Sequence, residues 1–218
     1  MAGATSLSIP GHDGKMVPNH FLGQDGDAAH LAIFFPGLGY TCDMPAFYYV
    51  QNMLENSTEL LRVEYAYGST TSFKSIADIE QFERLFDDAT AAWNAVRNKR
   101  PYQTVTFIGK SLGTLAVGQI LATDRSIPEM RVIWLTPLLR SERLLRQMQA
   151  FRGRSLIVIG TEDHHYDPEL LASLRETSGT ELLVIDGADH GLDIPGDVNG
   201  SVEAIRTIVA AIGRFLRT

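Results

Sequence analysis

Short, continuously apolar runs alternate along the chain with longer segments of helical periodicity, and this alternation constrains the fold most. The runs are rich in β-branched and aromatic residues, which is typical of strands buried on both faces. They cover residues 31–35, 60–65, 104–108, 131–135, 155–159 and 181–185. Strands that alternate with helices form right-handed crossovers. We therefore predict an α/β fold: a mostly parallel, twisted sheet with helices on both faces.

Helix signals occupy the segments between these runs. Ser75-Ile76-Ala77-Asp78 has the pattern of a capping box and opens residues 75–98, where apolar side chains recur at steps of three and four. Asp167-Pro168 combines a capping residue with a proline at the first helical position, ahead of residues 170–176. The other expected long helices are residues 112–123 and 201–217.

The first thirty residues differ from the rest. Two short extended pieces, residues 6–9 and 16–22, flank the turn-forming segment 10–14, which predicts a hairpin at the sheet edge. Neither a repeat nor a linker is visible further along, and 218 residues suit one core. We expect residues 1–218 to form a single domain.

Composition excludes several classes of protein. With 19 Lys and Arg against 26 Asp and Glu, the net charge of −7 repels phosphate backbones and anionic lipids, so neither nucleic acid nor membrane is an expected partner. Cys42, the one cysteine, excludes an intrachain disulfide and a multi-cysteine zinc site. No run approaches the ~18 apolar residues of a membrane span, and no signal-peptide pattern is visible. A soluble, cytoplasmic protein is expected, with its oligomeric state open.

Gly109-Lys110-Ser111-Leu112-Gly113 matches the G-x-S-x-G pattern. It lies directly after one predicted strand and directly before a predicted helix, which is where a nucleophile elbow must lie. We expect a strained Ser111 backbone, and flanking glycines whose Cβ atoms would clash with the neighbouring strand or helix. The alternative is a glycine-rich turn in which Ser111 only caps the helix.

A serine hydroxyl needs a base to remove its proton. Of the six histidines, only His190 lies in a glycine-rich loop after the last predicted strand. That strand delivers the loop to the same sheet edge as the elbow. His190 is therefore the candidate base, and the alternative is a surface histidine without a role.

The carboxylate that orients such an imidazole should come from the loop after residues 155–159. Asp163 is preferred, and Glu162 remains an alternative. Asp167 is better explained as a helix cap. Asp189 adjoins His190, but the side chains of loop neighbours usually diverge.

The order Ser111, Asp163, His190 resembles that of the α/β-hydrolase superfamily. Four loops, each following a predicted strand, carry the likeness over nearly the whole chain: residues 35–39, 109–113, 160–163 and 187–191. The resemblance implies acyl-transfer hydrolysis without a cofactor. It makes Ser111 the nucleophile, His190 the base and Asp163 the orienting acid.

An oxyanion hole requires two donors. Leu112, directly after the nucleophile, supplies one backbone N–H, and Leu38 in the loop after the first apolar run is expected to supply the other. Many members of the superfamily carry His-Gly where this chain has Pro36-Gly37, a departure that leaves the backbone donor intact. The residues expected to line the pocket are Gly39, Tyr40, Lys110 and His164.

The family's usual lid position holds only residues 136–154 here. Residues 138–150 predict one amphipathic helix, which is too little for a large cap domain. This helix is either a small flap or, by default, a crossover helix. An open site is expected in both cases.

Two loops near the expected site, residues 161–169 and 186–197, contain no lysine or arginine. Their acids are Glu162, Asp163, Asp167, Glu169, Asp186, Asp189, Asp193 and Asp197. We predict an electronegative rim that disfavours anionic acyl groups. Asp163, His164, His165 and Asp167 lie too close along one loop to converge on a metal ion, so no metal site is expected.

The leading hypothesis is a serine hydrolase acting on a small carboxylic ester, with no cofactor. Thioesterase, lactonase and peptidase activities use the same apparatus and remain open. The alternative from another class is a non-catalytic hydrolase-like domain that binds a small molecule or a partner.

Overall fold

The computed structural model describes residues 5–24, 28–54, 58–65, 67, 78–124 and 129–217. Its strands are β1 (Asn19–Leu22), β2 (His30–Phe35), β3 (Glu59–Val63), β4 (Thr104–Lys110), β5 (Glu129–Leu135), β6 (Arg154–Gly160) and β7 (Glu181–Ile185). They form one seven-stranded sheet in the order β1-β3-β2-β4-β5-β6-β7. Strand β1 pairs antiparallel with β3, and all other pairs are parallel. The predicted fold class is confirmed.

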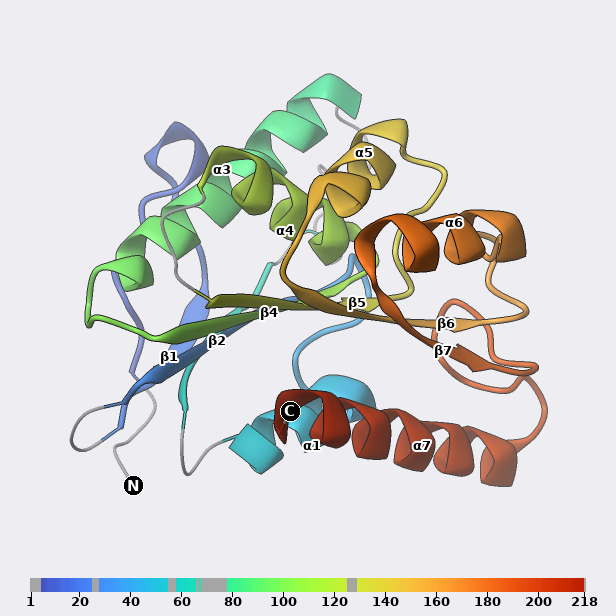
Figure 1. Ribbon diagram of the computed structural model, residues 1–218. Coiled ribbons are helices and arrows are strands. Elements are labelled where there is room, and N and C mark those ends of the chain that lie inside the picture. Colours follow the sequence, from blue (N-terminus) through green and yellow to red (C-terminus); the bar gives the residue numbers. More distant parts are fainter. Residues whose placement is uncertain are drawn as a thin grey trace.

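Helices cover both faces of the sheet (Figure 1). One face carries α3 (Asp78–Arg97), α4 (Leu112–Thr123), α5 (Glu142–Ala150) and α6 (Pro168–Ser178), and the other carries α1 (Pro45–Leu54) and α7 (Val198–Arg217). Each face has its own cluster of buried apolar side chains, because the central parallel strands are apolar on both sides. Strand β7 is instead an edge strand, and Val184 on it is exposed.

The segment before β1 forms the predicted edge hairpin. Pro10 and Met16 are paired antiparallel, the Val17 N–H donates to the Ile9 carbonyl oxygen at 2.9 Å, and a short 3-10 turn (His12–Gly14) closes the hairpin. The capping box predicted at residues 75–78 lies outside the described residues except for Asp78, where α3 begins.

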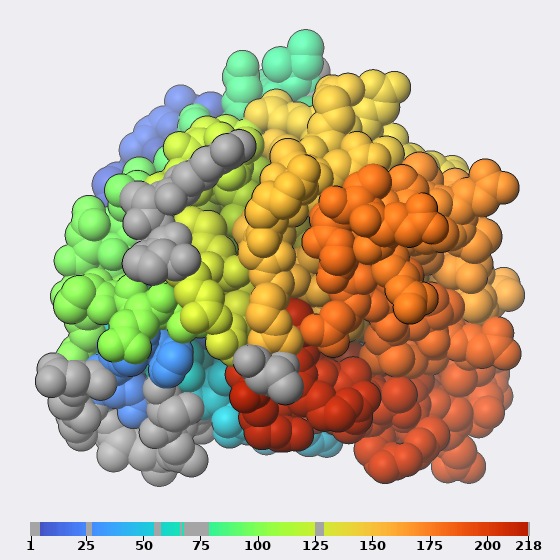
Figure 2. All heavy atoms as spheres, in the orientation of Figure 1, coloured from blue at the N-terminus to red at the C-terminus, as the bar shows by residue number. Residues whose placement is uncertain are grey.

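Helix α5 is shorter than the predicted segment 138–150. It begins after Ser141, whose Oγ accepts the Leu144 N–H at 3.3 Å, because this capping bond fixes the first turn. Leu144 and Met148 face the core, and α5 packs between α4 and α6 as a crossover helix. In the space-filling view the yellow-green, gold and orange segments adjoin, with no separate domain above them among the described residues (Figure 2). No large cap is present in this part of the chain.

Helix α6 begins where the sequence predicts. The Asp167 carboxylate accepts the N–H groups of Glu169 and Leu170, each at 3.0 Å, and Pro168 is the first helical residue. Among the helices of the described segments, none combines the length and the apolar character that a membrane span requires.

Candidate active site

Ser111 occupies a sharp turn between β4 and α4. Its backbone has φ 50° and ψ −116°, a conformation that is uncommon for a residue with a side chain and stores strain. The Ser111 N–H donates to the Leu135 carbonyl oxygen at 3.0 Å, and the Thr114 N–H donates to the Ser111 carbonyl oxygen at 2.9 Å. The Ser111 side chain makes no capping hydrogen bond to α4, so the helix-cap alternative does not describe it.

The flanking glycines allow α4 to approach the sheet closely. A Cβ on Gly109 would lie 2.8 Å from the Gly113 carbonyl oxygen. A Cβ on Gly113 would lie 1.9 Å from the carbonyl oxygen of Phe35 in β2. Both clashes are with backbone, so no side-chain movement relieves them. This is the steric requirement that the sequence predicts for the turn.

His190 lies between Ser111 and Asp163. Its Nε2 is 2.8 Å from Ser111 Oγ, and its Nδ1 is 2.8 Å from Asp163 Oδ2. The Asp163 side chain is buried, and its Oδ1 accepts the His165 N–H at 2.9 Å. Burial by itself would raise the pKa of Asp163, but the hydrogen bonds from His190 and His165 hold this pKa below its usual value. The carboxylate is therefore ionised beside the imidazole at neutral pH.

The other acids considered from the sequence are used elsewhere or lie in solvent. Glu162 is exposed, and Asp167 caps α6. Asp189 Oδ1 accepts the N–H groups of Gly191 and Asp193 at 2.7 and 3.2 Å, so it shapes the loop that carries His190.

The loop after β2 lies directly against the serine. A Cβ on Gly37 would be 3.3 Å from Ser111 Cβ, and the Gly37 N–H donates to the Tyr40 carbonyl oxygen at 3.1 Å. Leu38 lies within this closed loop. Leu112 is the first residue of α4, where backbone N–H groups have no partner within the helix. Both predicted backbone donors thus belong to segments that adjoin Ser111.

The four expected lining residues separate into two pairs. Gly39 and His164 are exposed, and the His164 ring centroid lies 4.9 Å from that of His190. Tyr40 and Lys110 are buried beneath the site instead of lining an open surface. This difference arises because both side chains bind groups of the protein itself.

Lys110 is almost completely enclosed, with 1% of its surface exposed. Its Nζ donates to Thr136 Oγ1 at 2.7 Å and to the His190 carbonyl oxygen at 2.6 Å. Burial lowers the pKa of Lys110 to about 8, although the nearby carboxylates oppose the shift. Sequence reasoning missed Thr136, because no motif or periodicity marks it.

His165 is a second residue that the sequence did not single out for the site. Its ring centroid lies 5.7 Å from that of His190, and burial together with the nearby His164 lowers the pKa of His165 to about 4. His165 is therefore neutral at physiological pH and adds no charge beside the base.

Metal-ligating groups meet only at this same place among the residues that the structure describes. Side-chain donor atoms of Asp163, His164 and His190 lie within 4.8 Å of one another. Asp163 and His190 are hydrogen-bonded to each other, so this cluster is part of the Ser111 site. Cys42 is buried, and this burial raises the pKa of its thiol, so it is no candidate nucleophile.

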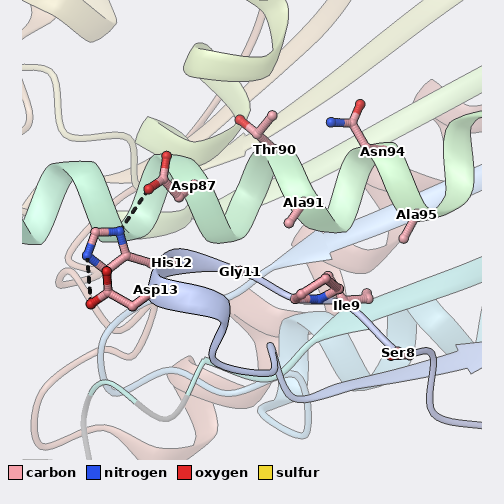
Figure 3. Close-up of a pocket in the computed structure, with 11 residues that line it drawn as sticks. Ser8, Ile9, Gly11, His12, Asp13, Asp87, Thr90, Ala91, Asn94 and Ala95 are labelled. Carbon is pink, nitrogen blue, oxygen red and sulfur yellow. Dashed lines mark hydrogen bonds and ion pairs between the residues drawn. The ribbon is translucent and has the colours of Figure 1, made fainter.

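A groove of about 530 Å³ lies elsewhere, between the N-terminal hairpin and α3. Figure 3 shows His12 beside Asp87 on this helix, with a His12 Nδ1–Asp87 Oδ2 distance of 2.8 Å. Neither Ser111, His190 nor Asp163 lines this groove, so it is not part of the candidate active site.

No protein-family model and no curated protein matches the chain. Several solved structures do match the chain in fold. Est1E from Butyrivibrio proteoclasticus superposes with a TM-score of 0.70 at 16% identity over 100% of both chains. XC6422 from Xanthomonas campestris, described as an α/β serine hydrolase without lid, gives 0.70 at 16% identity, covering 100% of this chain and 95% of its own. The esterase domain of a Rhodothermus marinus protein gives 0.66 at 15% identity, covering 97% and 98%.

The chain therefore has the α/β-hydrolase fold. At identities this low the likeness establishes the fold and leaves the activity to be argued from the site itself.

Proposed function

We propose that this protein is a serine hydrolase that cleaves a small carboxylic ester through an acyl-enzyme. The observation that carries the proposal is the continuous pair of 2.8 Å contacts from Ser111 Oγ through the His190 ring to Asp163. The arrangement matches the requirement for an activated hydroxyl: a base within reach of the nucleophile, and a third group that orients the base.

In this scheme Ser111 Oγ attacks the ester carbonyl carbon while His190 Nε2 takes the hydroxyl proton. Asp163 holds the imidazole through Nδ1 and stabilises its positive charge. The backbone N–H groups of Leu112 and Leu38 would bind the oxyanion of the tetrahedral intermediate. His190 then protonates the leaving alcohol, and a water molecule repeats the sequence on the acyl-enzyme. No cofactor enters these steps.

Two observations support a small ester as the substrate. The described residues include no large cap over the sheet edge that carries Ser111. A solved structure of the same fold is described as lacking a lid, and another is an esterase domain. Thioesters, lactones and peptides would be attacked by the same groups and remain alternative substrates.

Labelling with a fluorophosphonate probe tests the proposal, because the probe traps an activated serine without knowledge of the substrate. Wild-type protein should be labelled, Ser111→Ala should not, and Ser8→Ala, which removes an exposed serine, should label like wild type. Failure to label folded wild-type protein would instead favour a non-catalytic domain that binds a small molecule or a partner. Hydrolysis of a p-nitrophenyl ester series of increasing acyl length would then define the pocket.

A further inference from the structure

We propose that Lys110 is a positioning residue that ties the loop carrying His190 to the nucleophile elbow and to the loop carrying Leu38. The inference rests on the proposed hydrolase function. It assigns a role to a side chain that the catalytic scheme above does not use.

The order of the strands places the start of the His190 loop far from Ser111 along the sheet edge. His190 follows β7, which lies three strands from β4, and strands are spaced so that this separation is about 14 Å. The loop must therefore return across the ends of β6 and β5 to bring the imidazole to Ser111. A bond from the Glu162 N–H to the Ala188 carbonyl oxygen, at 3.0 Å, holds this loop to the end of β6, and Lys110 adds a bond to β4.

Lys110 bonds directly to the backbone of the base. Its Nζ donates to the His190 carbonyl oxygen at 2.6 Å, joining residues 80 positions apart. Because Lys110 immediately precedes Ser111, its side chain links the residue next to the nucleophile to the backbone of the base. A hydrogen bond from an ammonium group is about twice as strong as a neutral one.

The same ammonium contacts the loop after β2. Nζ lies 4.9 Å from the centroid of the Tyr40 ring, within the range of a cation–π contact. Tyr40 is itself fixed, because its hydroxyl accepts the Ala46 N–H at 3.1 Å. Its backbone carbonyl closes the loop that contains Leu38. Lys110 thus contacts the segments that carry the base and one proposed oxyanion donor.

Thr136 completes the arrangement. It is fully buried, and its Oγ1 accepts from Nζ at 2.7 Å. Its φ of 43° is strained for a β-branched residue. Backbone strain of this kind persists only where surrounding contacts enforce it, and it clusters at functional sites. Burying an ammonium group is also costly. Apolar packing alone would require neither a strained Thr136 backbone nor a buried ammonium group.

The charge state of Lys110 can be titrated in an accessible range, since its pKa is about 8. The charged groups that face it are Asp163, Asp189 and Asp193, and the other facing side chains are Tyr40 and Thr136. Burial raises the pKa of Tyr40 to about 12, so its hydroxyl stays protonated while Lys110 titrates. Loss of the Lys110 proton removes the cation–π contact and weakens the bond to His190.

The test compares second-order fluorophosphonate labelling rates of Lys110→Met and wild-type protein from neutral pH to about 9.5. At neutral pH we expect Lys110→Met to label at least about tenfold more slowly, with folding verified by circular dichroism. Wild-type labelling should decline as pH rises through about 8, and Lys110→Met should lack this decline. Lys99→Met is the matched control, because Lys99 also lies 4.9 Å from an aromatic centroid, that of Phe21, away from the site.

A wild-type rate in folded Lys110→Met, or an unchanged alkaline decline in that variant, would overturn the proposal. Should Lys110→Met fail to fold, Thr136→Val and Thr136→Ser decide: only serine keeps the hydroxyl acceptor, so equal labelling rates would contradict the inference. If folded wild-type protein is not labelled at all, the hydrolase function fails and this inference fails with it. If wild type is labelled and Lys110→Met is labelled at the same rate, the Lys110 inference is wrong while the hydrolase function stands.

Discussion

Ser111 Oγ and His190 Nε2 lie 2.8 Å apart although 79 positions separate the two residues in the chain. The contact exists because both residues follow strands that end at the same edge of the sheet. Loop residues at that edge can therefore converge from distant parts of the sequence, as ligand and catalytic groups in open α/β sheets generally do.

Asp163→Asn should slow fluorophosphonate labelling by about 10³–10⁴-fold, because an amide neither fixes the required tautomer of His190 nor stabilises its cation. Asp167→Asn is the matched control. Asparagine also caps a helix well, so this variant should keep both its stability and its labelling rate. A large loss in Asp167→Asn with none in Asp163→Asn would reverse the assignment of the orienting acid.

Gly113→Ala should destabilise the protein by about 3 kcal/mol or more, since its Cβ would meet the Phe35 carbonyl oxygen at 1.9 Å and only backbone movement could relieve the contact. Gly39→Ala adds the same atom where nothing lies within 4 Å, so its effect should stay within about 0.5 kcal/mol. Urea denaturation measures both. If Gly113→Ala changes the free energy of unfolding as little as Gly39→Ala does, α4 does not require a glycine where it approaches β2.

The stability contributed by Lys110 should rise with pH. Its pKa is about 8 in the folded protein against 10.5 for the free side chain, so between these values the unfolded chain holds more protons. The free energy of unfolding of wild type minus that of Lys110→Met should therefore increase over this interval, by at most about 1.4 kcal/mol per pH unit. Denaturation at several pH values measures the difference, and a flat or falling curve would exclude a depressed Lys110 pKa.

Neutral esters should react faster than carboxylate-bearing esters of equal length. Glu162, Asp186 and Asp193 are exposed on the two loops that carry Asp163 and His190. Lys110 is buried, and of these three acids it faces Asp193 alone, so its charge leaves Glu162 and Asp186 unopposed. The preference should weaken as salt is added, because exposed charges are screened. Faster turnover of the anionic ester at low salt would refute the electronegative rim.

Local signals in the sequence determined the strands, the bounds of α4 and the cap of α6. Strand and helix periods repeat over a few residues, and a capping residue such as Asp167 bonds to N–H groups only two and three positions away. The turn at Ser111 is equally local, since Gly109 and Gly113 lie within it.

Only the tertiary structure decided which acid lies beside His190 and where the Lys110 side chain points. Glu162 and Asp163 are chain neighbours with the same local signals, and the fold buries one while exposing the other. Lys110 reaches partners 26 and 80 positions away, at the ends of other strands. The positions of these side chains depend on the order of the strands across the sheet and on how far a loop extends back over the strand ends. No periodicity within a single segment encodes either of these.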